Sequence, residues 1–315
     1  MTVAHLIGKS GLGDRHHLPA TDPRPRPLVS RNYLSFALGH QRYRVAVSAQ
    51  STTYSLAILG GGNMGEALLG GLLEARWAPA GQIAVVEIVA ERRAHLAARF
   101  PGVSVVDAVP SCSAALIAVK PGDVPTAVEA AVEAGARRVL SIAAGVTLRV
   151  LDGAARGAAV VRAMPNTPAL VRAGSSAICA GSTATDADLA WAESILASVG
   201  TVVRLPEPQL DAFTGLIGSG PAYIYLVTEA LIDAGMLAGL SREVARDTVT
   251  QLLVGSAALL AQTGELPEVL RARVTSPGGT TAAGLQVLEQ HGVRAAFLAA
   301  VESATARSRE LGAQN

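Results

Sequence analysis

Glycines near residue 60 have a spacing that suits the binding of a diphosphate group. They form the pattern G-x-G-x-x-G, directly after a short apolar run, and the six residues are Gly60, Gly61, Gly62, Asn63, Met64 and Gly65. In such a loop the first glycine allows a tight turn, the second lets the backbone approach a pyrophosphate, and the third lets a helix pack closely on a strand. The free N–H groups at the start of the following helix then bind the phosphates. We therefore predict that these six residues bind a dinucleotide.

Charged residues follow the second apolar run, 83–86, where a Rossmann-type strand ends and the adenosine ribose is recognised. Glu87 can accept hydrogen bonds from a ribose 2′-hydroxyl, which favours NAD. Arg92 and Arg93 can face a 2′-phosphate, which favours NADP, although arginines on a helix surface are commonly solvated. The sequence leaves the choice between NADPH and NADH open.

A second candidate motif is formed by Ala118, Val119, Lys120 and Pro121, at the end of the predicted strand 114–119. Lys120 is the only lysine after Lys9, in a chain that otherwise uses arginine for its basic residues. A compact ammonium group differs chemically from the planar guanidinium group, and open α/β sheets bind ligands at the carboxyl ends of their strands. Lys120 is therefore a candidate cofactor-binding and catalytic residue.

The next predicted strand, 138–142, is followed by small residues that let the backbone lie along a nicotinamide ring. These residues are Ala143, Ala144 and Gly145. We assign them to the cofactor site.

A third motif near the C-terminus combines a Pro-Gly-Gly turn with four hydroxyl side chains. The candidate site residues are Ser276, Gly278, Gly279, Thr280 and Thr281, with Thr275 beside them. Free N–H groups at a helix start, with hydroxyls next to them, form a site for a carboxylate. A helix start that is merely capped needs one Ser or Thr, so we favour an anion site over a simple cap. No residues stand out as metal ligands.

Composition and charge narrow the class of protein. Of 315 residues 50% are hydrophobic, 16% are charged and 3% are aromatic, and the formal net charge is +1. Residues 1–54 hold seven basic and two acidic side chains, so the remainder is mildly acidic. A nucleic-acid-binding protein concentrates basic charge on its folded surface, which argues against nucleic-acid partners here.

Two further features indicate a protein of the cytoplasm that does not span a membrane. The most apolar helical run, 221–240, is interrupted by Glu229 and Asp233. Cys112 and Cys179 form neither a C-x-x-C pair nor a disulfide framework, as expected of free thiols in a reducing compartment.

Short apolar runs alternate with helical patterns from residue 55 onward, which predicts βαβ units and a parallel sheet. The predicted strands are 56–59, 83–86, 103–106, 114–119, 138–142, 159–163, 176–179 and 202–205. After Pro206 and Pro208 only helical patterns follow. We therefore predict an α/β protein with a flexible N-terminal extension (1–54), a doubly wound Rossmann-type domain (55–205) and a helical domain for substrate binding and dimerisation (206–315).

Several motifs, taken in order, resemble the pyrroline-5-carboxylate reductase family over about residues 55–312. The C-terminal signature of that family is matched by Pro267, Leu270, Val274, Thr275, Ser276, Gly278, Gly279, Thr281, Gly284, Leu285, Leu288 and Glu289. The runs 164–168 and 218–223, the glycine-rich loop and Val119-Lys120-Pro121 also look like this family. The extension before residue 55 is not part of the pattern, and some relatives have Asn where Arg273 stands.

The resemblance implies reduction of the cyclic imine 1-pyrroline-5-carboxylate to L-proline by NADPH or NADH. It also implies that Gly278–Thr281 hold the substrate carboxylate and that the Thr281 hydroxyl faces the ring nitrogen. In the family, C-terminal helices of two subunits interlock, dimers often assemble into decamers, and the loop 276–281 of one subunit meets the nicotinamide of the other.

The scarcity of acid–base groups in the motifs suits this chemistry. A ketone reductase must protonate a developing alkoxide, usually with His, Lys or Tyr. A cyclic imine can arrive already protonated, so hydride attack yields a neutral amine and catalysis rests on positioning and electrostatics. His95 and His291 are the only histidines after residue 54, and neither lies in a motif.

Two other functions fit the sequence less well than the reductase. A β-hydroxyacid dehydrogenase would share the first domain and fits Gly215, Gly218 and Gly220, but Ile224 stands for its catalytic Lys and Thr228 for its Asn. A cofactor-binding regulator that has lost turnover would show damage in the loop 276–281, and that loop is intact.

Overall fold

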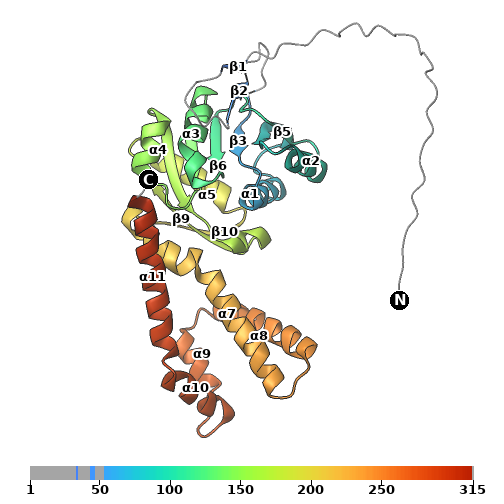
Figure 1. Ribbon diagram of the computed structural model, residues 1–315, viewed down its shortest axis with the longest axis vertical. Helices are drawn as coiled ribbons and strands as arrows, with labels where there is room; N and C mark the ends of the chain where they lie inside the picture. Colours follow the sequence, from blue (N-terminus) through green and yellow to red (C-terminus); the bar gives the residue numbers. More distant parts are fainter. Residues whose placement is uncertain (1–32, 35–42, 47–52, 314–315) are drawn as a thin grey trace, which may run out of the picture. The chain divides into compact units, whose positions relative to one another are not determined.

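The structure is a computed structural model that describes residues 33–34, 43–46 and 53–313 (Figure 1). The chain divides into two compact units, Met1–Arg31 and Asn32–Asn315, and every described residue belongs to the second. Most of the predicted flexible extension, 1–54, therefore lies outside the described residues.

An eight-stranded sheet forms the first part of the described chain, in the order β10-β9-β8-β7-β6-β3-β4-β5. Its strands are β3 (Leu56–Leu59), β4 (Ile83–Val86), β5 (Ser104–Val106), β6 (Ala114–Ile117), β7 (Arg138–Ser141), β8 (Ala159–Met164), β9 (Gly174–Ala180) and β10 (Gly200–Arg204). From β5 to β8 neighbouring strands run parallel, and this order is that of a classic dinucleotide-binding sheet. The predicted α/β fold class is confirmed.

Alternate residues of the central strands bury into two different cores, as expected of a sheet covered on both faces. In β3, Leu56 and Ile58 join one apolar cluster, and Ala57 and Leu59 join another. The first cluster includes side chains from helices in residues 63–74, 90–99 and 186–196, and the second includes side chains from helices in residues 124–133 and 148–155. All four residues of β3 are fully buried, which explains why the strands read as continuous apolar runs.

The helices that cover the sheet connect its strands. They are α1 (Asn63–Glu74), α2 (Ala90–Arg99), α3 (Val124–Glu133), α4 (Leu148–Ala155) and α5 (Asp186–Leu196). The sequence patterns predicted the first three but not α4 or α5. In addition, β9 runs antiparallel to β8, whereas we expected a parallel sheet.

Two short strands from the N-terminal segment also belong to the described residues. β1 (Tyr33–Leu34) pairs antiparallel with β2 (Val45–Ala46). Tyr43 and Val45 pack against the second core cluster, and the Val109 N–H donates to the Arg44 carbonyl at 2.7 Å. This part of the segment thus contacts the body, which the sequence did not predict.

Beyond β10 the described residues form helices. They are α6 (Leu210–Phe213), α7 (Gly220–Leu237), α8 (Arg242–Thr263), α9 (Pro267–Arg273), α10 (Thr280–Gln290) and α11 (Val293–Ala313). A 3-10 turn, Glu207–Gln209, precedes α6, and a π-helical turn, Thr214–Gly218, links α6 to α7.

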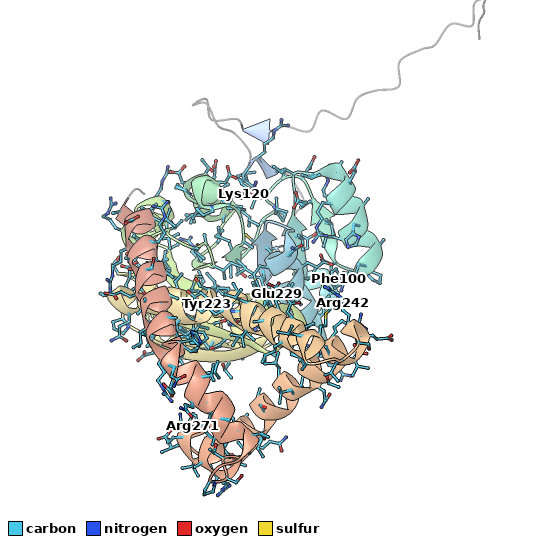
Figure 2. All side chains as sticks on the ribbon, turned by 60° about the horizontal axis from the view of Figure 1, so that its bottom comes forward. Phe100, Lys120, Tyr223, Glu229, Arg242 and Arg271 are labelled. Carbon is cyan, nitrogen blue, oxygen red and sulfur yellow. The ribbon has the colours of Figure 1, made fainter. Side chains whose placement is uncertain are left out.

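Helix α7 leaves its apolar side chains exposed in the single chain. None of its described residues is buried, and Tyr225, Leu226 and Leu237 are 60%, 66% and 91% exposed. By length and composition alone, the stretch Glu207–Leu237 could cross a membrane, and 6% of its most apolar window is buried. The stretch carries Glu229 and Asp233, and Figure 2 labels Glu229 on this helix.

Candidate active site

The glycine-rich loop has the geometry required of a diphosphate site. Gly60 has φ +103°, and a Cβ at this position would lie 2.5 Å from the Ala118 carbonyl oxygen. A Cβ on Gly65 would lie 2.1 Å from the Gly60 carbonyl oxygen. Both positions therefore require glycine, because strand β6 and helix α1 approach the loop closely.

Gly62 differs from its two neighbours in the motif. No described atom lies within 4 Å of a Cβ placed on it, so the loop leaves open space at this position. Gly62 is also the N-cap of α1, where no described side chain caps the free N–H groups. An open space in front of uncapped amides at a helix N-terminus suits the diphosphate of a dinucleotide.

Charged side chains from β4 and α2 hold the middle glycine of the loop. The Gly61 N–H donates to Glu87 Oε2 at 3.0 Å, and Arg92 Nε donates to the Gly61 carbonyl at 2.6 Å. The second oxygen of Glu87 accepts from the Val89 N–H at 2.8 Å. Arg93 donates to the carbonyls of Glu87 and Ile88 at 2.8 and 2.9 Å. Glu87 and Arg92 thus contact the loop, Arg93 bonds the backbone just after β4, and each of the three already has a partner within the protein. The roles predicted for them at the ribose stay predictions.

Glu66, in the first turn of α1, joins this network. It contacts Arg92, and its other oxygen lies 2.7 Å from Arg99 and 3.5 Å from His95 Nε2. Burial raises the pKa of Glu66, but hydrogen bonding to Arg92 and the charges of Arg92 and Arg99 outweigh burial, so that its pKa lies below the ordinary value. The carboxylate therefore stays ionised and ties α2 to the start of α1.

The ends of β6 and β7 lie side by side, since the Ile142 N–H donates to the Ile117 carbonyl at 3.1 Å. Ala118 touches the glycine loop, and its N–H donates to the Leu59 carbonyl at 2.8 Å. Val119, Lys120 and Pro121 follow, with Lys120 exposed to solvent before the turn that leads into α3 (Figure 2). Ala143 is buried, and Gly145 has φ +73° in the loop between β7 and α4. These cofactor candidates therefore share the carboxyl edge of the sheet with the glycine loop.

The predicted carboxylate site lies at the start of α10, in the helical part. Gly278 has φ +69°, and Gly279 is the N-cap of the helix that begins at Thr280. No side chain in the described part of the chain caps this N-terminus, so Thr280 and Thr281 do not have the capping role of the alternative account. The Ser276 hydroxyl lies against Gly279, where a Cβ would be 2.3 Å from its Oγ, and Thr281 is half-buried.

Sequence reasoning missed two side chains that hold the start of the helical part. Asn166, in the run 164–168, donates from Nδ2 to the Ile217 carbonyl at 3.2 Å and accepts from the Ser175 N–H at 2.9 Å. Within the helical part, the hydroxyl of Tyr223, a residue labelled in Figure 2, donates to the Gly215 carbonyl at 3.1 Å. The only available signal was that both residues lie in family-like motifs, which indicated no role for either.

The two cysteine thiols form no part of this site, and neither does any cluster of metal ligands within the described part of the chain. Burial raises the pKa of the Cys112 and Cys179 thiols to about 12, and both are free cysteines. Among the described residues, no group of three or more His, Cys, Asp or Glu side chains is arranged to hold a metal ion.

The sheet order and the glycine loop define the class, a Rossmann-type dinucleotide-binding protein with a helical C-terminal part. A family model described as "NADP oxidoreductase coenzyme F420-dependent" matches residues 55–145, and one described as "Pyrroline-5-carboxylate reductase dimerisation" matches residues 207–311.

Known proteins identify the family within this class. A pyrroline-5-carboxylate reductase of Synechocystis sp. is 44% identical over 263 residues, covering 82% of this chain and 98% of the relative. One from Mycobacterium tuberculosis is 42% identical, covering 81% of this chain and 96% of the relative. The chain therefore belongs to the pyrroline-5-carboxylate reductase family.

Solved structures agree with this assignment. The structure of a pyrroline-5-carboxylate reductase from Coxiella burnetii has a TM-score of 0.76 and 33% identity, covering 82% of this chain and 99% of that one. The Plasmodium falciparum enzyme, solved with NADP bound, has a TM-score of 0.71 and 28% identity, covering 84% and 100% of the two chains. Family membership decides against the β-hydroxyacid dehydrogenase alternative.

Proposed function

We propose that this protein reduces 1-pyrroline-5-carboxylate to L-proline, the last step of proline biosynthesis, with hydride supplied by NADPH. The observation that carries the proposal is that the chain belongs to the family and has glycine as the N-cap of α1 and of α10, at Gly62 and Gly279, each without a side-chain cap. The first suits a dinucleotide diphosphate and the second suits a carboxylate, which are the two anions that this reaction must hold.

The cofactor half of the site is assigned to the carboxyl edge of the sheet. The amides that follow Gly62 bind the diphosphate, and the loop 143–145 supports the nicotinamide. Lys120 and Pro121, with Ala118 and Val119, complete this edge. When bound, the cofactor supplies the hydride. Arg93 is the group we assign to the 2′-phosphate. The Arg92 guanidinium holds Gly61 and Glu66, whereas Arg93 bonds the Glu87 and Ile88 carbonyls through Nη1 alone, just after β4, where the adenosine ribose is recognised.

The substrate half of the site is assigned to the loop 276–281. Its amides and the Ser276 hydroxyl bind the carboxylate, and the Thr281 hydroxyl accepts a hydrogen bond from the N–H of the protonated imine. This bond orients the C=N group so that its carbon faces the hydride donor. Hydride addition to the protonated imine gives a neutral secondary amine, so the protein does not have to supply a proton during the step.

Two subunits form each site on this proposal, the sheet of one chain meeting the loop 276–281 of the other. The exposed apolar residues of α7 and α8 support it, because a helix that is apolar on more than one face has to be covered. The dimerisation-domain match covers both helices and the apolar stretch 207–237, so a second copy accounts for its exposure. Assembly of dimers into decamers and a cytoplasmic location belong to the same proposal.

The test is the oxidation of NADPH and of NADH by the purified protein at 340 nm, with and without 1-pyrroline-5-carboxylate. We expect oxidation only when the imine is present, faster with NADPH, with L-proline formed in equal amount. Absence of imine-dependent oxidation with either cofactor would refute the proposal. A matched control is Gly62→Asp, which places a negative charge in the diphosphate site.

A further inference from the structure

Glu207 makes two short hydrogen bonds at the point where the helical part begins. Its Oε1 accepts from Arg162 Nη1 at 2.6 Å and from the Leu148 N–H at 2.7 Å. Glu207 opens the 3-10 turn that follows β10 and is the first residue matched by the dimerisation model. One carboxylate oxygen thus joins the helical part to two separate elements of the sheet-bearing part.

The Leu148 N–H belongs to the first turn of α4. Thr147, the N-cap, has no side-chain capping bond, and its buried hydroxyl has no hydrogen-bond partner among the described residues. Helix N-termini carry free N–H groups that favour a negative partner. Glu207 therefore supplies, from a distant part of the chain, an acceptor for one free N–H group of this uncapped N-terminus.

Arg162 holds the other side of the same junction. It lies in β8, where only 6% of the residue is exposed, and its register partner in β7 is Ser141. A buried guanidinium needs a carboxylate partner, so the ion pair with Arg162 holds the Glu207 side chain in place.

The loop between β7 and α4 runs from the sheet to the N–H group that Glu207 accepts from. It begins after Ser141, beside Arg162, and ends at Leu148, which is bonded to Glu207. This loop contains Ala143, Ala144 and Gly145, the residues assigned to the nicotinamide. Glu207, which holds the end of the loop, is in turn bonded to Arg162.

We infer that Glu207 is a positioning residue, which sets the nicotinamide loop by holding Leu148 and so couples the dimerisation helices to the cofactor site. The inference rests on the proposed function, because that function places the nicotinamide beside the loop. A displacement of about 1 Å between reacting groups can lower a rate about 100-fold, so a loosened loop should reduce turnover.

The first variant is Glu207→Asp, which keeps the charge opposite Arg162 but draws the carboxylate back from the Leu148 N–H. Dissociation constants are measured for NADPH and for 2′-phospho-ADP-ribose, which is the same cofactor without its nicotinamide, together with kcat and KM. We expect kcat to fall about 10- to 100-fold and NADPH affinity to weaken, with the affinity for 2′-phospho-ADP-ribose unchanged. Glu207→Gln keeps an acceptor oxygen at full reach of the Leu148 N–H but removes the charge opposite Arg162. It should therefore recover part of the loss in kcat while lowering the melting temperature.

The control is Glu193→Ala. Glu193 has the same side-chain exposure as Glu207, 32%, and also bonds an arginine, Arg204, but it binds no backbone group of the loop. Glu193→Ala should have the kcat, the KM and the two dissociation constants of the wild-type protein. A purely structural role for Glu207 would weaken both ligands alike, or would lower the melting temperature alone, and either result overturns the inference. If the wild-type protein oxidises no NADPH with the imine, the proposed function fails, while the two dissociation constants still test Glu207.

Discussion

Substitution by alanine should lower the stability of the fold at Gly65 but should weaken cofactor binding at Gly62. A methyl group on Gly65 would lie 2.1 Å from the Gly60 carbonyl oxygen. Because this oxygen belongs to the backbone, the clash can be relieved only by shifting the chain. Overpacking of this kind costs about 1–3 kcal/mol of folding free energy. At about 2–4 °C per kcal/mol for a domain of this size, Gly65→Ala should lower the melting temperature by about 2–12 °C.

Gly62→Ala should leave the fold intact and damage cofactor binding. Its φ of −67° is accessible to alanine, and no described atom lies within 4 Å of the new methyl group. The methyl group instead occupies the space assigned to the diphosphate. Loss of one hydrogen bond to a charged group costs about 1.5–3 kcal/mol, which corresponds to about a 10- to 150-fold rise in the dissociation constant.

The two variants are compared by thermal unfolding without cofactor and by titration with NADPH, followed through its fluorescence. We expect Gly62→Ala to melt like the wild type and to bind NADPH at least about 10-fold more weakly. Wild-type NADPH affinity in folded Gly62→Ala would refute the assignment of the loop. An unchanged melting temperature for Gly65→Ala would refute the packing constraint read from the close approach of Gly60.

Three further predictions concern single side chains. Thr281→Val keeps the shape of the side chain but removes its hydroxyl, and kcat/KM should fall about 10- to 150-fold; unchanged kinetics in a folded variant would remove Thr281 from the site. Arg93→Gln should raise KM for NADPH about 10-fold and leave KM for NADH nearly unchanged, whereas equal changes would contradict its assignment to the 2′-phosphate. Because the pKa of Glu66 is lower in the folded protein than its ordinary value of 4.5, Glu66 stabilises the fold above that value and the contribution is lost as pH falls through the folded pKa. Glu66→Gln should therefore lower the melting temperature at neutral pH and reduce its further drop on acidification, and parallel pH curves for the two proteins would contradict this.

The strands of the sheet were predictable because burial on both faces leaves an apolar run in the sequence. β3 and β4 begin and end where expected, at Leu56–Leu59 and Ile83–Val86. α4 was missed because it is short, eight residues with Gly153 inside it, and part of its start is held by Glu207 rather than by a local cap. The antiparallel direction of β9 depends on the connection through the turn Thr167–Val171, for which the apolar pattern of a strand carries no information.

The candidate site likewise contains residues that a local sequence pattern indicates and residues that only the fold brings together. The glycine loop and the loop 276–281 are short contiguous motifs, so spacing alone indicated what they can bind. Glu207 acts on Leu148 and Arg162, which are 59 and 45 residues away, and no spacing rule connects them. The partners of Arg92 and Arg93 were equally hidden, because only the fold shows that both bond within the protein.

The central claim is that hydride passes from NADPH to the imine carbon of 1-pyrroline-5-carboxylate. It is tested most directly with NADPH that carries deuterium at both positions of nicotinamide C4, followed by mass spectrometry of the product. The account predicts L-proline with one deuterium, located at C5. Unlabelled proline, label at another carbon, or NADPH oxidation without proline would contradict it.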